Sequence, residues 1–297
     1  MSSEQRNRIS VFKDDLARHG YVADCSLAAT LLLAQSLERP VLLEGEAGVG
    51  KTDVAKALAL AGGTRLIRLQ CYEGLDAHST LYEWNYQRQL LAIKLLEHDA
   101  RSVSEKERDI FSEAYLLKRP LLEAISAVPA AVLLIDEIDR ADEAFEAYLL
   151  ELLSDYQVSI PEFGTIHAAT RPLVILTSNG TRELSDALRR RCLYHYVDYP
   201  DFAKELMIVQ TRLPLAPLVL ARQVVEFVQS LRGLDLRKKP GIAETLDWIS
   251  ALLQLGLSTL DENGMESIMD SLSALVKTRE DRARLTTPVI QKMVATC

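Results

Sequence analysis

Residues 41–52 read VLLEGEAGVGKT, and this stretch decides the fold. Its apolar start, residues 41–43, predicts a short buried strand. Gly45 and the run Gly50-Lys51-Thr52 then match the pattern G-x-x-x-x-G-K-[ST], and a helix is expected from Asp53 to about residue 61. A glycine-rich loop between a strand and a helix is the context in which this pattern binds nucleotide phosphates. The sequence therefore predicts an α/β fold with a phosphate-binding loop.

The chemistry of phosphate binding explains the residue types in this loop. Glycines let the backbone turn so that its N–H groups face phosphate oxygens, and the helix amino terminus adds a partial positive charge. Lys51 is expected at the β- and γ-phosphates, and the Thr52 hydroxyl is expected to bind Mg²⁺. The predicted nucleotide contacts within the motif are Gly45, Glu46, Ala47, Gly48, Val49, Gly50, Lys51, Thr52 and Asp53.

A second apolar run, residues 132–137 with the sequence VLLIDE, ends in two carboxylates. Ligands bind at the carboxyl ends of strands in open α/β sheets, so Asp136 is expected to hold Mg²⁺ and Glu137 to activate water. The alternative is an acidic pair that only begins a helix. A GTPase would carry N-K-x-D to read guanine, and this pattern is absent from the sequence. The nucleotide is therefore expected to be ATP.

Strands and helices alternate to about residue 203, and only helices are expected beyond it. This pattern predicts an α/β domain over residues 1–203 and a helical domain over residues 204–297. Helical rhythm also predicts helices within residues 84–118, and alternation around Pro161 predicts a β-hairpin at 157–168. Helices are expected at 84–96, 110–125, 217–232, 241–256, 261–277 and 286–296, with a polar link at 98–107.

Composition narrows the class of protein. The chain has 297 residues, 48% hydrophobic residues and a formal net charge of −8, which disfavours a protein that grips nucleic acid through phosphates. No window is long and apolar enough to span a membrane, and the polar start is unlike a secretory signal, so we expect a cytoplasmic protein. The four cysteines lack a CxxC pair and are expected to be reduced and mostly buried. The five scattered histidines lack the spacing of a zinc site.

At these motifs the chain resembles the AAA+ ATPases, and within them the MoxR group. The resemblance implies a parallel-sheet core, a C-terminal helical lid and a homo-oligomeric, hexameric ring. It also implies that residues 84–118 and the hairpin at 157–168 are insertions into the α/β core. It implies that Asn179, after the strand ending in Thr177-Ser178, is the sensor 1 residue that helps place the lytic water. Arg191, just before Cys192, corresponds to the arginine finger that reaches the neighbouring subunit's γ-phosphate.

Other positions of the family pattern are less distinct in this sequence. Arg189 and Arg190 are alternatives for the finger, or serve as a solvated helix end. Tyr21 and Val22 resemble the stretch that covers the adenine. No arginine falls clearly on the sensor 2 position of the lid, where Arg237, Lys238 or Lys239 substitutes, or no residue does.

Three stretches resemble the CoxD subgroup of that family, whose members act in maturing the copper–molybdenum centre of carbon monoxide dehydrogenase. They are residues 82–91, 119–122 and 239–246. The resemblance implies a client metalloenzyme and a partner protein with a von Willebrand A domain. In the insertion, Trp84 and Tyr86 are either client contacts or core anchors. Two other functions stay open, a motor acting on nucleic acid and a nucleotide-gated adaptor with little turnover.

Overall fold

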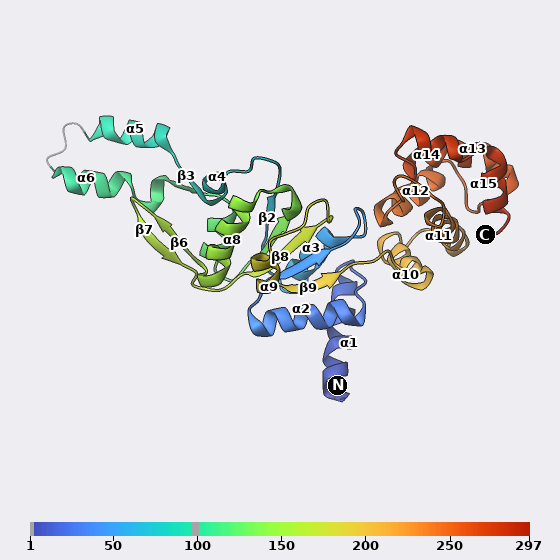
Figure 1. The fold of residues 1–297 in the computed structure, drawn as a ribbon, viewed down its shortest axis with the longest axis horizontal. Helices are drawn as coiled ribbons and strands as arrows, with labels where there is room; N and C mark the ends of the chain where they lie inside the picture. The colour runs from blue at the N-terminus through green and yellow to red at the C-terminus, as the bar shows by residue number, and fades with distance from the viewer. Residues whose placement is uncertain (1–2, 97–100) are drawn as a thin grey trace. The chain divides into compact units, whose positions relative to one another are not determined.

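A five-stranded sheet forms the core of the α/β part in the computed structural model, which describes residues 3–96 and 101–297 (Figure 1). The strand order is β2-β5-β8-β1-β9, and the β2–β5, β5–β8 and β8–β1 pairs are all parallel. Strand β8 thus lies between the strand that precedes the phosphate loop and the strand that ends in Asp136. The strands are β1 (Val41–Glu44), β2 (Leu66–Gln70), β5 (Val132–Asp136), β8 (Leu173–Ser178) and β9 (Leu193–Tyr196).

Two of the helices of this part, α2 and α8, begin at a side chain that caps them. Asp24 Oδ1 accepts a hydrogen bond from the Leu27 N–H at 2.7 Å, and Asp142 Oδ1 accepts one from the Phe145 N–H at 2.8 Å. Such caps satisfy backbone donors that have no partner within the helix. The helical elements of this part are α1 (Ser3–Arg18), α2 (Cys25–Leu37), α3 (Lys51–Ala61), α7 (Pro120–Ser126), η2 (Ile138–Arg140), α8 (Glu143–Asp155) and α9 (Asp186–Arg191).

The insertion is present, but its elements differ from the prediction. The helix expected over 110–125 is replaced by a short strand that pairs antiparallel with Tyr82–Trp84, and a new helix begins at Pro120. Proline is accepted in the first turn of a helix and disrupts its interior, which explains this start. The elements are α4 (Ala77–Leu81), β3 (Tyr82–Trp84), α5 (Tyr86–Leu95), α6 (Val103–Ile110), η1 (Glu113–Tyr115) and β4 (Leu116–Lys118).

The predicted polar link at 98–107 is wrong in its second half, because α6 begins at Val103. Ser102 and Glu105 form a capping box, a local start signal that outweighs the polar composition. Residues 97–100 of the predicted link lie outside the described residues. Trp84 is buried and packs edge to face on Phe111, with ring centroids 5.3 Å apart, so it is a core anchor.

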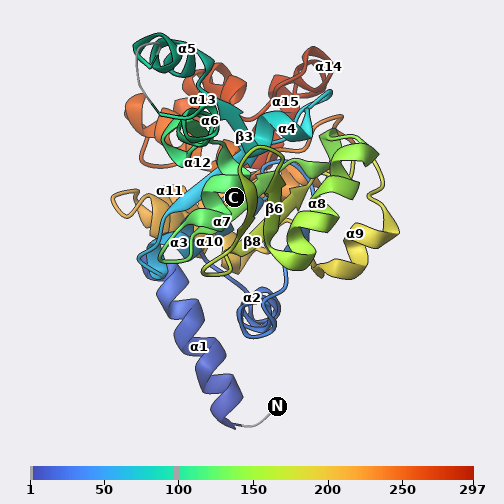
Figure 2. The same cartoon turned by 90° about the vertical axis from the view of Figure 1, so that its left-hand side faces the viewer.

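The β-hairpin is confirmed, with β6 (Gln157–Ile160) antiparallel to β7 (Gly164–His167). In Figure 1 the hairpin and the α5–α6 pair lie toward the same end of the α/β part, and this end faces the viewer in Figure 2. The two insertions are therefore presented on one side.

The C-terminal helices pack around a hydrophobic core of their own, where the fully buried rings of Phe227 and Trp248 lie 4.9 Å apart. An additional helix that was not predicted begins at Phe202, where Asp201 caps it, and the helix predicted over 261–277 is divided into shorter segments. The elements are α10 (Phe202–Arg212), α11 (Leu218–Arg232), α12 (Ile242–Gln254), η3 (Glu262–Gly264), α13 (Met265–Ser271), η4 (Leu272–Ala274), α14 (Arg279–Arg284) and α15 (Thr287–Val294).

Contacts group the chain into two compact units. One unit comprises residues up to Ala28, Gly45–Ala57 and Tyr196–Cys297, and the other comprises Ala29–Glu44 and Leu58–His195. The phosphate loop thus groups with the C-terminal helices, and the domain boundary at 203/204 stays a prediction. Within the described residues, every helix is too short or too polar to cross a membrane. Cys71 and Cys192 are buried, whereas Cys25 is exposed and Cys297 is half-buried.

Candidate nucleotide-binding site

The phosphate loop, residues 45–52, adopts a backbone that requires glycine. Gly48 and Gly50 have φ values of +80° and +89°, in the left-handed region that other residues enter only with strain. A β-carbon at Gly45 would lie 2.3 Å from the carbonyl oxygen of Val197, so this position also excludes side chains. Left-handed residues within a tight loop allow neighbouring N–H groups to converge on an anion. Helix α3 begins directly at Lys51 and adds its amino terminus to the same place.

Lys51 is held inside this loop. Its side chain is 6% exposed, and its ammonium donates hydrogen bonds to the carbonyl oxygens of Gly45 and Glu46, each at 2.7 Å. These bonds offset the cost of burying the cation and fix its place beside the loop backbone. A buried ammonium, left-handed glycines and a helix amino terminus together fit a bound polyphosphate.

The stretch before α12 lies against the phosphate loop. The Ile242 N–H donates to the Gly48 carbonyl oxygen at 2.9 Å, and a β-carbon at Gly241 would lie 2.7 Å from the Gly48 Cα. A cavity of about 740 Å³ opens here, a size typical of small-molecule sites. Its lining includes Glu46, Gly48, Tyr199 and three cationic residues, Arg237, Lys238 and Lys239. All three sensor 2 candidates thus line one cavity beside the phosphate loop.

The expected adenine contacts are placed unequally. A β-carbon built at Gly50 would lie 4.0 Å from Cε2 of Tyr21, so the Tyr21 ring lies beside the loop. Burial, with smaller effects from the charges of Asp24 and Asp53, raises the pKa of the Tyr21 hydroxyl, which therefore stays neutral. Val22 follows it and is half-buried. Contact of either residue with adenine stays a prediction.

Asp136 ends strand β5 as a buried carboxylate, with 3% exposure. Its Oδ1 accepts a hydrogen bond from the Thr177 hydroxyl at 2.5 Å. Its Oδ2 accepts two from the Arg68 guanidinium, from Nη2 at 2.5 Å and from Nε at 3.1 Å. Sequence reasoning missed both donors, because each comes from a neighbouring part of the sheet far away in the chain.

Glu137 follows in a left-handed conformation, with φ 56° and ψ 50°. This backbone costs a non-glycine residue roughly 1–3 kcal/mol, and such strain is concentrated at functional sites. The Glu137 N–H donates to the Thr177 hydroxyl at 2.9 Å, and its carboxylate forms an ion pair with Arg140, with 3.0 Å between Oε2 and Nε. Thr177 therefore joins the two residues of the acidic pair. The sequence signal that could have identified Thr177 is its position at the end of β8, two residues before Asn179.

Replacing Thr177 by valine is expected to lower the free energy of unfolding by about 1–3 kcal/mol, because it leaves the Asp136 carboxylate and the Glu137 N–H each short of a buried partner. ATPase turnover should fall as well. Urea unfolding and steady-state ATPase assays measure both effects. Thr177→Ser keeps the hydroxyl and is the matched control, so a valine variant equal to the serine variant would contradict this role.

Asn179 is held close to the acidic pair by Asp139. One oxygen of Asp139 accepts hydrogen bonds from the Asn179 N–H at 3.2 Å, the Thr181 N–H at 3.0 Å and the Thr181 hydroxyl at 2.6 Å. Burial alone would raise the pKa of Asp139, but these hydrogen bonds bring it below its usual value. Asp136, Glu137 and Asn179 thus share the carboxyl edge of the sheet. The sequence motifs did not identify Asp139 as a residue of this site.

Arg191 lies elsewhere. It is exposed at the carboxyl end of α9, and the Leu193 N–H that follows donates to the Pro40 carbonyl oxygen at 2.8 Å. This contact places the end of α9 beside the amino end of β1, whereas the phosphate loop follows the carboxyl end of β1. The four residues of β1 extend over roughly 13 Å. The structure therefore does not bring Arg191 to the edge that carries Asp136, Glu137 and Asn179. Arg189 lies over the Tyr194 ring, with 5.7 Å from Cζ to the ring centroid.

Comparison with known proteins identifies the family to which the chain belongs. Residues 40–192, more than half of the chain, match the AAA domain family of the dynein-related subfamily. The chain belongs to this family. The match spans the phosphate loop, the acidic pair, Asn179 and Arg191, so the protein is an ATPase that uses ATP and Mg²⁺. Proteins of this class generally assemble as rings.

Relatives and solved structures extend the comparison. An uncharacterized protein of Staphylococcus haemolyticus is 28% identical over 74% of this chain and 78% of its own length. An uncharacterized protein of Staphylococcus aureus is 27% identical over 74% of this chain and 77% of its own length. Among solved structures, a candidate ATPase of Cytophaga hutchinsonii covers 99% of this chain and 94% of its own, with TM-score 0.47 and 17% identity. The RuvB Holliday junction branch migration motor of Thermotoga maritima covers 95% and 72%, with TM-score 0.43 and 18% identity.

The residues present also fit the family's metal ion. Mg²⁺ usually takes only one or two protein ligands and completes its shell with water and substrate phosphates. A threonine in the first turn of α3 and a buried carboxylate, that of Asp136, are ligands of the types that suit this requirement. Within the described residues there is no cluster of three or more histidine, cysteine, aspartate or glutamate side chains that could hold a metal alone. When bound, Mg²⁺ would neutralise charge on the phosphates.

Proposed function

We propose that this AAA ATPase is a MoxR-type chaperone that remodels a client metalloenzyme. The observation that carries the proposal is a group of exposed apolar side chains on the inserted helix α5. Tyr86, Leu90, Leu91 and Leu95 are 64%, 60%, 59% and 76% exposed. Apolar side chains gathered on a surface typically mark a site for another protein. An insertion that adds such a surface to an ATPase core suits a machine that acts on a protein client.

The nucleotide chemistry is assigned residue by residue. Lys51 binds the β- and γ-phosphates, Thr52 and Asp136 hold Mg²⁺, and Asp53 lies in the first turn of α3 after the loop. Glu137 orients and activates the attacking water, with Asn179 as the sensor that helps place it. The cationic cavity lining at Arg237, Lys238 and Lys239 supports an anionic ligand there and provides the sensor 2 charge. Tyr21 and Val22 cover the adenine.

Assembly completes the site. Arg191 is exposed at the opposite end of β1 from the phosphate loop, which supports a role toward a neighbouring subunit. A contact between the loop of one subunit and the arginine of the next is head to tail, and such contacts close into rings. We propose a hexamer. An arginine at the γ-phosphate stabilises charge that develops during transfer.

The resemblance to the CoxD subgroup supplies the client, carbon monoxide dehydrogenase before its copper–molybdenum centre is complete, and a von Willebrand A domain partner. The test uses Glu137→Gln, which should bind ATP without hydrolysing it. This variant is expected to co-elute with purified immature dehydrogenase only when ATP is present. Lys51→Ala is the control and should not co-elute. If the dehydrogenase does not bind in an ATP-dependent way, the chaperone function is contradicted. Binding to a nucleic-acid strand that weakens linearly with the logarithm of the salt concentration would favour a nucleic-acid motor instead.

The β-hairpin provides a separate test of the client's site. Replacing residues 161–165, at its tip, by a short Gly-Ser turn should leave basal ATPase activity within about twofold, because surface changes away from a site usually have small effects. Maturation of the client should stop. ATPase assays and carbon monoxide oxidation by the matured enzyme measure the two outcomes. Unchanged maturation would make the hairpin a structural element only.

A further inference from the structure

Arg39, in the turn between α2 and β1, binds the carboxyl end of α9. Its Nε donates to the Arg191 carbonyl oxygen at 3.1 Å, and its Nη2 donates to the carbonyl oxygens of Arg190 at 2.6 Å and Cys192 at 3.4 Å. The last carbonyl groups of a helix have no partner within it. A guanidinium is suited to them, since it offers several donors in one plane and its positive charge favours a helix carboxyl terminus.

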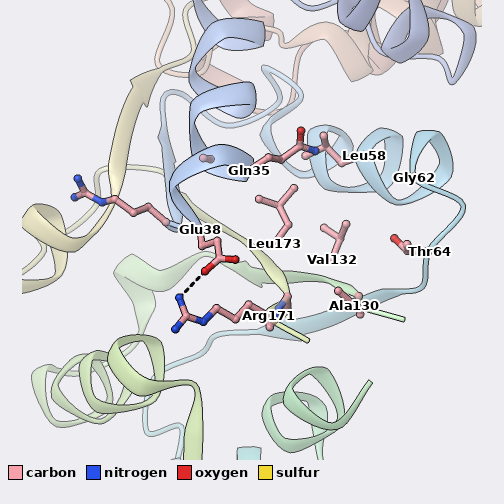
Figure 3. A pocket seen from close by; sticks show the side chains of 13 residues that line it. Gln35, Glu38, Leu58, Gly62, Thr64, Ala130, Val132, Arg171 and Leu173 are labelled. Atoms are coloured by element: carbon pink, nitrogen blue, oxygen red, sulfur yellow. Dashed lines mark hydrogen bonds and ion pairs between the residues drawn. The ribbon is translucent and has the colours of Figure 1, made fainter. Parts of the chain in front are cut away.

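Contacts made by Glu38, the preceding residue, hold the backbone of Arg39 in position. Glu38 has a φ of 51°, a strained left-handed value for a residue with a side chain. Its carboxylate is bound by Arg171, with 2.5 Å between Nη1 and Oε2, and Figure 3 shows this pair at a pocket that Gln35 and Leu173 also line. The Glu38 carbonyl oxygen accepts a hydrogen bond from the Tyr156 hydroxyl at 3.4 Å.

The following residue is fixed as well. The carbonyl oxygen of Pro40, which is buried, accepts the hydrogen bond from Leu193 that begins β9 beside β1. The turn that carries Arg39 is therefore held on both sides, by Glu38 and by Pro40. A side chain that starts from so constrained a backbone can hold a partner in one position.

The charged side chains near the end of α9 are cationic, so the partners of Arg39 are backbone carbonyl groups and not carboxylates. Arg189, Arg190 and Arg191 follow one another in the last turn of α9, so Arg39 adds a fourth guanidinium to a cationic segment. Like charges repel, and within the described residues no carboxylate forms an ion pair with Arg39. Its half-buried side chain is instead held by three backbone acceptors.

We propose that Arg39 is the positioning residue for the arginine finger, and this inference rests on the proposed role of Arg191 in trans. By binding the carbonyl groups of residues 190–192, Arg39 fixes the backbone from which the exposed Arg191 side chain projects. Arg39 touches neither ATP nor the transferred phosphoryl group. Its effect should therefore fall on the ATPase rate of the neighbouring site and not on ATP binding by its own subunit.

The first test separates turnover from binding. Arg39→Gln is expected to lower kcat about 100-fold, the effect of misplacing a catalytic group by roughly 1 Å, with KM for ATP unchanged. Arg39→Lys should be intermediate, because lysine keeps the charge but loses the planar fork. Arg65→Gln is the matched control, since Arg65 is an exposed arginine beside the amino end of β2 that pairs with Glu123 instead. The control should retain its activity. A rise in KM with kcat unchanged for Arg39→Gln would overturn the proposal.

The second test identifies the subunit on which Arg39 acts. Mixed with Lys51→Ala protein, Arg39→Gln protein should regain activity, because some interfaces then join an intact loop to an intact finger. Mixed with Arg191→Ala protein, it should not. The reverse pattern would show that Arg39 serves its own phosphate loop through β1, and would overturn the proposal. If Arg39→Gln does not fold, as judged by circular dichroism, Arg39→Lys undergoes the same mixing.

A third mixture keeps the two proposals distinguishable. Lys51→Ala and Arg191→Ala proteins contain no change at Arg39, so their mixture tests only whether the finger acts in trans. Recovery there, with no recovery for Arg39→Gln plus Lys51→Ala, overturns the role of Arg39 alone. No recovery in the third mixture overturns the finger in trans, and the role of Arg39 with it.

Discussion

Replacing Arg191 by alanine is expected to lower the ATPase rate by about 10³–10⁵-fold, or ~4–7 kcal/mol of barrier, while ATP still binds. The structure supports so large and selective an effect. Arg191 is exposed at the amino end of β1, so its loss leaves the phosphate loop and the acidic pair of its own subunit unchanged. What is lost is the positive charge that stabilises the transferring phosphoryl group. Steady-state ATPase assays and calorimetric titration with ATP measure rate and affinity separately.

Arg189 provides the matched control for that experiment. Arg189 lies two residues before Arg191 in α9, and its guanidinium lies over the Tyr194 ring. Arg189→Ala should therefore cost little ATPase activity. Wild-type turnover in Arg191→Ala protein, with loss of turnover in Arg189→Ala or Arg190→Ala protein, would transfer the finger role to that residue. Wild-type turnover in all three would remove it from α9.

Lys51→Ala is expected to weaken ATP binding by roughly 100-fold or more. Charge-assisted hydrogen bonds to two phosphates contribute about 1.5–3 kcal/mol each, and 1.4 kcal/mol corresponds to tenfold in affinity. Lys51 is the only cationic residue in the sequence 45–52, so no other side chain of the loop can supply this charge. Calorimetry measures the affinity directly. Near-normal affinity would contradict the assignment of residues 45–52 as the phosphate loop.

Glu137→Gln is the natural comparison for Lys51→Ala, because it should retain ATP binding and lose turnover. The left-handed backbone at Glu137 and the hydrogen bond from its N–H to Thr177 do not depend on the carboxylate. Glutamine therefore preserves the backbone of the site and removes the base, together with the ion pair to Arg140. Loss of ATP affinity in this variant would show that Glu137 is structural.

Elements built from local signals could be predicted from the sequence. The apolar run at 41–43 predicts a strand before the glycine loop, the apolar run that precedes Asp136 predicts another, and both strands are present. The same holds for the hairpin, where Pro161 and Gly164 mark the turn. In the insertion, by contrast, residues 116–118 became a strand because Leu116 pairs with Trp84 across 32 residues of chain. Helical periodicity carries no information on such a partner.

The side chains that organise the site were harder to predict for the same reason. Thr177 meets Asp136 across 41 residues, and Arg39 meets Arg191 across 152. These contacts depend on β8 lying between β1 and β5, an order that follows from chain crossovers and not from any motif. Sequence motifs identify residues whose type is dictated by direct contact with the phosphates. Residues that only hold those groups in place can vary in type, and only the three-dimensional structure identifies them.

If each ATP site is completed by an arginine from another subunit, a mixture of two inactive proteins should be active. Lys51→Ala and Arg191→Ala proteins are combined in equal amounts and the ATPase rate is measured at rising protein concentration. If subunits assort at random, about one quarter of the interfaces, one half times one half, join an intact loop to an intact finger. We expect activity to return toward about a quarter of the wild-type rate as rings assemble. A mixture that stays inactive at every concentration, although rings form, would contradict completion of the site by another subunit.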